Sequence, residues 1–224
     1  MHRGLKLSAV IPCYNEEAGV RDVLIRMPAV VDEVVVVDNN CTDRTAQVAL
    51  GLGARVVAQP IRGYGAAYKA GLATATGDVI VTLDGDGSYP PEEIPRLVDI
   101  LLERGLDFLS ACRFPLSDPG AMEITNRLGN GVLTAATALL FFKPIRDSQS
   151  GMWVMRRAAL ERLRLTSDGM AFSEEIKLEA LLKRLEFGEF HIPYGERVGT
   201  IKLRKWRDGL ANLAFLVRKR VGLV

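Results

Sequence analysis

Short apolar runs alternate with helical stretches through the first half of the chain, and this alternation is the strongest constraint on its fold. The runs are rich in β-branched residues and lie at residues 7–11, 34–37, 55–58, 79–83 and 108–112. Helical stretches are predicted between them, at residues 18–27, 42–51, 65–75 and 91–103. Strands that alternate with helices form βαβ units. The sequence therefore predicts an α/β fold with a mainly parallel sheet and helices on both of its faces.

After residue 112 the alternation fades. The predicted elements are a long apolar helix at 124–141, a strand at 151–155, an amphipathic helix at 173–184, an extended segment at 189–200 and a basic helix at 205–220. The chain has 224 residues, of which 48% are hydrophobic, and no low-complexity linker divides it. That is enough to bury one substantial core. We expect one catalytic domain over residues 1–203 and an amphipathic helix over residues 204–224.

Several functional classes lose support from what the sequence lacks. There is no P-loop and no Gly-x-Gly-x-x-Gly after the first predicted strand, which argues against ATP hydrolysis and dinucleotide oxidoreduction. Neither of the two histidines has metal-ligand spacing, and the three cysteines are odd in number and far apart. Such cysteines are typical of a reduced, cytoplasmic protein. No apolar run reaches the roughly 18–20 residues that span a bilayer, and no signal peptide is visible.

Two acidic residues follow the run at 79–83 with one glycine between them: Asp84 and Asp86. In parallel sheets, ligands bind beyond the carboxyl ends of the strands. Two carboxylates on a tight turn can share a Mg²⁺ or Mn²⁺ ion, which also bridges diphosphate oxygens. Asp-Gly-Asp is by itself an ordinary turn sequence. Its place at the end of a buried strand favours the metal site.

The other strand ends carry polar or glycine residues too. Asp38 ends the run at 34–37, where a carboxylate can accept hydrogen bonds from a nucleobase or a ribose. Gly63 and Gly65 let the backbone approach a ligand closely, or form a tight turn only. These junctions, together with residues 12–17, predict a nucleotide site at one edge of the sheet.

Five segments together resemble a known family. They read IPCYNEE, VVVVDNNCTDRT, LDGDGSYPPEE, DSQSGMWVMRR and ERVGTIKL in chain order. This order is similar to that of the GT-A glycosyltransferases of family 2, and most of all to the synthases of polyprenyl- or dolichyl-phosphate sugars. The resemblance covers roughly residues 7 to 205. Asn39 departs from it where many relatives have a second aspartate, and Ser88 where mannosyl synthases often have glutamine.

The resemblance implies a role for each matching position. Residues of the nucleotide pocket would be Pro12, Tyr14 and Glu16, with Asp38 near the base and Asp84 and Asp86 on the metal. Arg113 and Arg127 would hold an acceptor phosphate, a task for which guanidinium groups are suited. Surface solvation is the alternative for both. The remaining candidates are Glu175, which also suits a helix start, and Arg197 and Lys202 in a loop that closes over the phosphates.

The reaction that the resemblance implies is an inverting, metal-dependent transfer of a hexosyl group from a UDP- or GDP-sugar to a polyprenyl phosphate. Because a lipid phosphate is already ionised at pH 7, no strong general base is needed. A hydroxyl acceptor would instead need a carboxylate such as Asp86 or Glu175. A sugar nucleotidyltransferase and a non-catalytic sugar-nucleotide-binding module remain as alternatives. No nucleic-acid partner is expected.

The final part of the chain is basic. Eight Lys or Arg residues and one acid, Asp208, lie between Arg197 and the end. Apolar residues recur among them at helical spacing, beginning with Trp206 and Leu210. A basic amphipathic helix with a tryptophan can lie in a membrane interface, and it can equally pack on the protein's core or on a second subunit. We expect a peripheral protein on the cytoplasmic face of a membrane.

Overall fold

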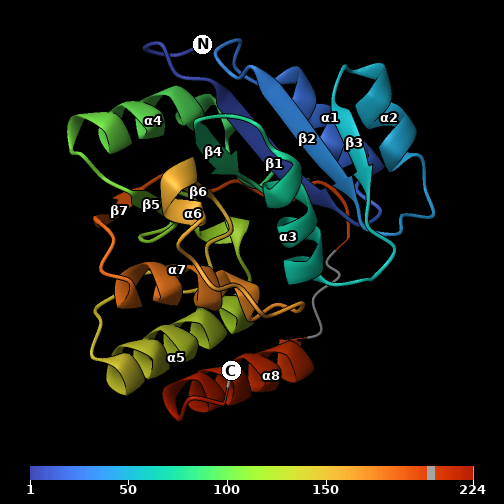
Figure 1. The fold of residues 1–224 in the computed structure, drawn as a ribbon. Helices are drawn as coiled ribbons and strands as arrows, with labels where there is room; N and C mark the ends of the chain where they lie inside the picture. Colours follow the sequence, from blue (N-terminus) through green and yellow to red (C-terminus); the bar gives the residue numbers. More distant parts are fainter. Residues whose placement is uncertain (201–204, 224) are drawn as a thin grey trace.

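The computed structural model describes residues 1–200 and 205–223, and a seven-stranded sheet forms its centre (Figure 1). The strand order is β3-β2-β1-β4-β6-β5-β7. The strands are β1 (Leu7–Cys13), β2 (Glu33–Asp38), β3 (Arg55–Ala58), β4 (Val79–Thr82), β5 (Phe108–Cys112), β6 (Trp153–Arg156) and β7 (Phe187–His191). All five runs predicted in the first half of the chain are strands of this sheet.

The sheet is mainly parallel, as predicted, with one antiparallel strand. Strands β1 to β4 pair in parallel, and β5 pairs in parallel with β7. Strand β6 is antiparallel to both β4 and β5. Residues 147–151 precede β6 and lie at the carboxyl end of β4. From this position β6 runs back along β4 in the opposite direction. The reversed strand therefore places the segment before it next to Asp84.

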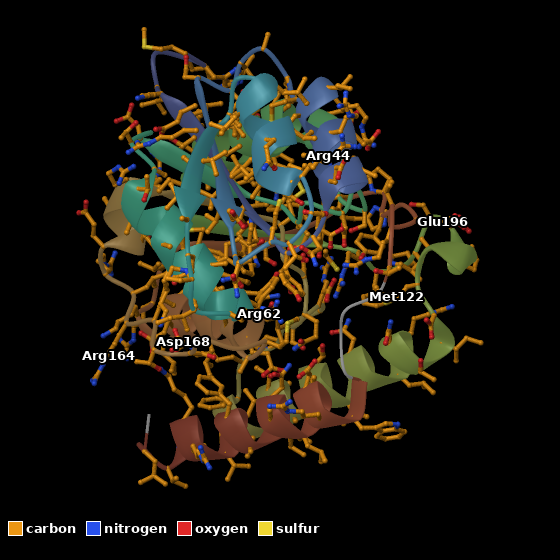
Figure 2. All side chains as sticks on the ribbon, turned by 90° about the vertical axis from the view of Figure 1, so that its right-hand side faces the viewer. Arg44, Arg62, Met122, Arg164, Asp168 and Glu196 are labelled. Carbon is orange, nitrogen blue, oxygen red and sulfur yellow. The ribbon has the colours of Figure 1, made fainter. Side chains whose placement is uncertain are left out.

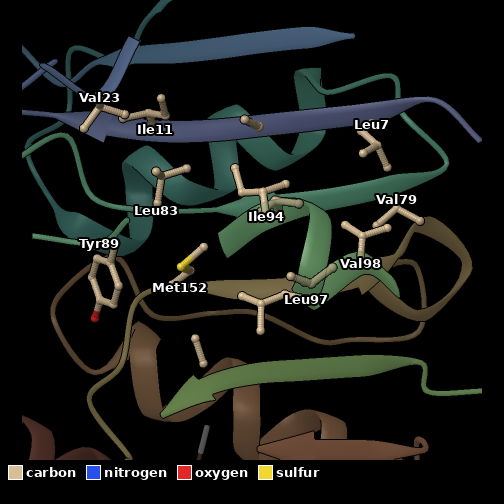
Figure 3. Packing of buried hydrophobic residues seen from close by; sticks show 14 of the residues in the cluster. Leu7, Ile11, Val23, Val79, Leu83, Tyr89, Ile94, Leu97, Val98 and Met152 are labelled. Carbon is tan, nitrogen blue, oxygen red and sulfur yellow. The ribbon is translucent and has the colours of Figure 1, made fainter. Parts of the chain in front are cut away.

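Helices cover both faces of the sheet, as predicted. The core on one face packs against α1, α2 and α4, and Figure 3 shows part of it around Ile11, Leu83 and Leu97. The core on the other face packs against α3, α6 and α7. The helices are α1 (Glu17–Ile25), α2 (Thr45–Gly51), α3 (Tyr64–Thr74), α4 (Ile94–Glu103), α5 (Ile124–Phe141), α6 (Arg157–Leu160), α7 (Phe172–Leu182) and α8 (Lys205–Arg220). Two short 3₁₀ helices, Pro91–Glu93 and Pro119–Ala121, precede α4 and α5.

Helices α5 and α8 lie away from the sheet, side by side below α7 in Figure 1. Leu133 of α5, Leu178 of α7 and Leu216 of α8 are buried together where the three helices meet. Lys219 adds an ion pair from α8 to Glu179 of α7, at 2.8 Å. The predicted basic helix therefore packs on the body of the protein along one side. Among the described residues, no helix combines the length and the apolar character needed to cross a bilayer.

Candidate active site

Asp84 is held at the carboxyl end of β4 by two tyrosines of α3. The hydroxyls of Tyr64 and Tyr68 donate to its Oδ1 at 3.2 and 3.1 Å. Burial, and after it the charge of the neighbouring Asp86 carboxylate, raise the pKa of Asp84 to about 7. The raised pKa shows that a second negative charge at this place is costly unless a cation offsets it.

Asp86 is buried and both of its carboxylate oxygens are engaged. Oδ1 accepts hydrogen bonds from the backbone N–H of Ser88 at 2.9 Å and from its hydroxyl at 2.6 Å. Oδ2 accepts from the Nη2 of Arg197. Ser88, which departs from the family pattern, therefore fixes the orientation of the Asp86 carboxylate. Arg197 neutralises this carboxylate in the protein alone.

The Asp84–Asp86 pair fits a divalent cation that is shared with a substrate. Mg²⁺ is usually bound by one or two carboxylates together with substrate phosphates and water, rather than by a cage made of protein alone. Residues 1–200 and 205–223 contain no cluster of three or more His, Cys, Asp or Glu side chains arranged to bind a metal. A crowded carboxylate pair at the end of a strand is a donor set suited to a metal–diphosphate complex.

A cavity of about 450 Å³ joins this pair to the helices below the sheet. Arg113, Tyr194 and Arg197 line it near the carboxylates, while α5 and α8 line its other end. In Figure 2, Met122 and Glu196, two further lining residues, lie on the same side of the molecule above α5. Of the residues predicted from the sequence, the cavity brings together Asp84, Asp86, Arg113 and Arg197.

Arg113 is fixed in the cavity wall by a bidentate ion pair. Its Nε and Nη2 donate to Asp147 at 2.8 and 2.7 Å. Burial acts to raise the pKa of Asp147, but the charge and hydrogen bonds of Arg113, together with the charge of Lys177, outweigh it and hold this pKa at about 2. The guanidinium also lies 5.3 Å from the ring centre of Tyr194. Arg113 is therefore a rigid, permanently charged group beside the carboxylate pair.

The residues predicted for the nucleotide lie at the neighbouring strand ends, outside this cavity. Cys13 of β1 is in register with Asp38 of β2, so Pro12 lies near the end of β1, Tyr14 and Glu16 follow this strand, and Asp38 ends the next. Asp38 accepts from the backbone N–H of Cys41 at 2.8 Å. The guanidinium of Arg62 lies 4.4 Å from the ring centre of Tyr14.

Asn39 performs a task that an aspartate could not. Its Nδ2 donates to the carbonyls of Gln59 and Ile61 at 3.0 and 2.7 Å, and its Oδ1 accepts from the N–H of Gly63 at 2.9 Å. A carboxylate has no N–H to donate. This departure from the family pattern therefore fixes the loop between β3 and α3.

The lack of a Cβ at Gly63 and Gly65 lets this loop pack closely on residues 167–168, and the approach of a ligand to its backbone stays a prediction. A Cβ at Gly63 would lie 2.3 Å from the carbonyl oxygen of Asp168, and one at Gly65 would lie 2.2 Å from that of Ser167. The backbone of residues 167–168 therefore fills the space that the glycines leave. Figure 2 shows Asp168 close to Arg62, at the end of this loop.

Glu175 and Arg127 do not line the cavity. Ser173 does, and because residues two positions apart on a helix point about 200° apart, Glu175 faces the opposite side of α7. There its carboxylate accepts from the N–H groups of Thr166 and Ser167 at 2.9 and 2.8 Å, so it fixes a loop instead of facing an acceptor. Arg127 is exposed on α5. Lys202 lies outside the described residues.

Sequence reasoning missed a polar chain that links α7 to α8 through the cavity wall. Gln149 donates to Glu174 at 2.6 Å and accepts from Asn212 at 3.1 Å. Burial raises the pKa of Glu174 to about 8, against the opposing effect of Lys177. In the sequence, this region was indicated by the DSQSG motif at residues 147–151. The residues of α7 and α8 are distant from this motif in the chain and come into contact with it when the chain folds. Tyr64 and Tyr68 were missed for the same reason.

Similarity to known proteins agrees with this geometry. The model of glycosyl transferase family 2 matches residues 8–164. The chain therefore belongs to glycosyltransferase family 2, with a GT-A fold, and it is a glycosyltransferase.

Two relatives from Haloferax volcanii are 33% identical to it. The dolichyl-phosphate hexose transferase aligns over 92% of this chain and 90% of its own length. The low-salt glycan biosynthesis hexosyltransferase Agl6 aligns over 94% of this chain, which spans about half (53%) of that relative. Among solved structures, glucosyl-3-phosphoglycerate synthase from Mycobacterium tuberculosis with Mg²⁺ and uridine diphosphate has a TM-score of 0.77. It is 25% identical, with 98% of this chain and 80% of that chain covered.

Proposed function

We propose that the protein transfers a hexosyl group, with inversion, from a UDP- or GDP-sugar to a polyprenyl phosphate. The observation that carries this proposal is the crowded Asp84–Asp86 pair, which shares one cavity with the two cations Arg113 and Arg197. Carboxylates suited to a metal–diphosphate stand at one end, and a fixed guanidinium suited to a second phosphate stands beside them.

Asp84 and Asp86 would hold Mg²⁺ or Mn²⁺, which when bound acts as a Lewis acid on the leaving diphosphate. Tyr64, Tyr68 and Ser88 orient the two carboxylates before any ligand arrives, so little reorganisation is needed. Arg197 would move from Asp86 to the diphosphate oxygens and neutralise charge that develops on them. Asp38, Tyr14 and Glu16 would bind the nucleoside at the neighbouring strand ends.

The acceptor is proposed from the chemistry of the cavity wall. Apart from Asp84 and Asp86, the acids that line it are Glu123, Glu196 and Asp208, while Asp147 pairs with Arg113 in its wall. A phosphate oxygen is ionised at pH 7 and needs no base. The Haloferax transferase whose name specifies dolichyl phosphate aligns over most of both chains, which supports the same acceptor class. Because a polyprenyl phosphate is held in a membrane, the protein would have to reach the membrane surface. We therefore propose peripheral attachment on the cytoplasmic face.

A phosphorylated small molecule with a hydroxyl acceptor is the second candidate. The structural similarity to glucosyl-3-phosphoglycerate synthase supports it. A hydroxyl would need a base, and of the two carboxylates named for this role from the sequence, Asp86 lines the cavity while Glu175 is turned away from it.

The test is a matched screen of donors and acceptors. Purified protein is incubated with UDP- and GDP-sugars and either polyprenyl phosphate or 3-phosphoglycerate, with Mn²⁺, Mg²⁺ or EDTA. We expect metal-dependent transfer of the sugar into the organic-phase product. Transfer to 3-phosphoglycerate alone would replace the lipid acceptor by the second candidate. Undiminished transfer in EDTA would contradict the role of the metal.

A further inference from the structure

Helix α5 carries an uninterrupted apolar stripe on its outer side. Ile124, Leu128, Val132 and Leu139 are 62–74% exposed, and at about 100° per residue they fall within one narrow arc of the helix. The buried residues of α5, among them Leu133, lie on the opposite side. The sequence of α5 contains no acidic residue. An exposed stripe of this length is unusual for a surface that only meets water.

Helix α8 carries a second stripe. Its buried residues Asn212 and Leu216 dock the helix on the body, and its outer side exposes large apolar residues. Basic residues flank that outer stripe on both sides when the helix is viewed along its axis. The apolar residues are Trp206, Leu210, Leu213 and Val217, and the basic ones are Arg207, Arg218 and Arg220.

The two helices also line the end of the cavity that lies away from Asp84 and Asp86. We call it the acceptor end, and the end at the two carboxylates the donor end. Gly129 and Leu133 of α5 and Gly209 and Asn212 of α8 contribute to its wall. The helices pack side by side and away from the sheet, as Figure 1 shows. The exposed apolar stripes are therefore carried by the same two helices that line one end of the cavity.

We infer that α5 and α8 together form a face that binds the surface of an anionic lipid bilayer, with α5 supplying much of the apolar contact. We call it the α5–α8 face and define it by Ile124, Leu128, Val132, Leu139, Trp206, Leu210, Leu213 and Val217. The arginines beside the α8 stripe complement lipid phosphates, and the apolar stripes enter the boundary of the acyl chains. The attribution to α5 goes beyond the sequence, which pointed to the basic helix alone.

This inference deepens the proposed function, because a lipid acceptor would then reach the cavity from the face that lies on its membrane. The binding itself needs neither donor nor acceptor. It can therefore be tested on vesicles that contain no polyprenyl phosphate, so its failure is distinct from failure of the proposed chemistry.

The experiment is flotation of the full chain with vesicles of phosphatidylcholine alone or mixed with phosphatidylglycerol. The test variant is Leu128→Glu/Leu139→Glu. The control is Ile25→Glu/Leu50→Glu, which places the same two charges on exposed apolar residues of α1 and α2. Leu128→Ser/Leu139→Ser repeats the test without added charge, and circular dichroism checks that each variant is folded.

We expect the wild type and the control to float with the anionic vesicles, and both α5 variants to bind about tenfold more weakly. Binding of the wild type should also weaken in high salt. Absence of the wild type from the floated fraction, or equal flotation of the α5 variants, would overturn the inference. So would a wild-type dimer, seen by light scattering, that the α5 variants dissociate, because the face would then bind a second copy of the chain.

Discussion

The two ends of the cavity are built in different ways. At the donor end, Asp84 and Asp86 lie just after strand β4, where the hydroxyls of Tyr64 and Tyr68 fix the first and Ser88 fixes the second. At the acceptor end, three helices meet, and the wall depends on contacts such as that between Gln149 and Asn212. The first end is positioned by the sheet and the second by helix packing. Binding of the donor should therefore be sensitive to the change of single atoms. Binding of the acceptor should be sensitive to how the three helices pack.

The largest effect is expected at the carboxylate pair. Asp86→Asn should lower the rate of transfer about 1000-fold, or about 4 kcal/mol, because one ligand of the metal–diphosphate complex is lost. Asp99→Asn, on the surface beside Arg3, is the matched control. The rate is measured with a radiolabelled donor at saturating metal. Similar rates for Asp86→Asn and wild type would break the assignment of the donor end.

Arg197→Gln should have two opposite effects. Removing the cation that neutralises Asp86 should tighten the binding of Mn²⁺ alone, while binding of the metal–nucleotide complex should weaken about tenfold, because a charged contact to the diphosphate is lost. Calorimetric titrations with and without nucleotide measure both. Arg44→Gln, at an exposed arginine of the surface, serves as control. Unchanged binding of Mn²⁺ alone would show that Arg197 does not compete with the metal.

At the acceptor end, Glu174 should make stability depend on pH. Its pKa rises from 4.5 to about 8 on folding, so between these values only the folded chain keeps the proton. The free energy of unfolding therefore falls as the pH rises through this window, and the loss is complete above it. Glu174→Gln lacks this loss, and its advantage over wild type should grow by about 3 kcal/mol between pH 5 and pH 8.

Urea denaturation at the two pH values measures this advantage. Glu186→Gln, at an exposed glutamate after α7, should show none. The same pH dependence in wild type and Glu174→Gln would mean that Glu174 is ionised at neutral pH in the folded protein.

The smallest effect is expected from Asn212→Ala. It removes the hydrogen bond that α8 makes to Gln149 in the cavity wall. We expect the KM for the acceptor to rise about threefold, which corresponds to a weak, partly buried hydrogen bond, with the KM for the donor unchanged. Steady-state kinetics with each substrate varied in turn separate the two values. Equal changes in the two KM values would contradict the assignment of donor and acceptor to different ends of the cavity.

This difference also explains how much the sequence could predict. The βαβ alternation and the carboxylates after residue 83 are local patterns; the sheet confirms the first and places the second just after β4. The antiparallel direction of β6 and the contact of Tyr68 with Asp84 depend on segments that are distant in the chain. The resemblance made Glu175 a candidate that also suited a helix start, and the phase of α7 turns it away from the cavity. Local chemistry was predictable, and helix docking was not.

Binding of nucleotide and metal tests the central claim most directly. UDP and GDP are titrated into wild type, Asp84→Asn and Asp86→Asn, each with Mn²⁺ and then with EDTA, and the heat of binding is recorded. We expect one of the nucleotides to bind the wild type only when Mn²⁺ is present, and binding to be lost in both variants. Equal affinity in EDTA, or in the two variants, would contradict a metal–diphosphate site at Asp84 and Asp86.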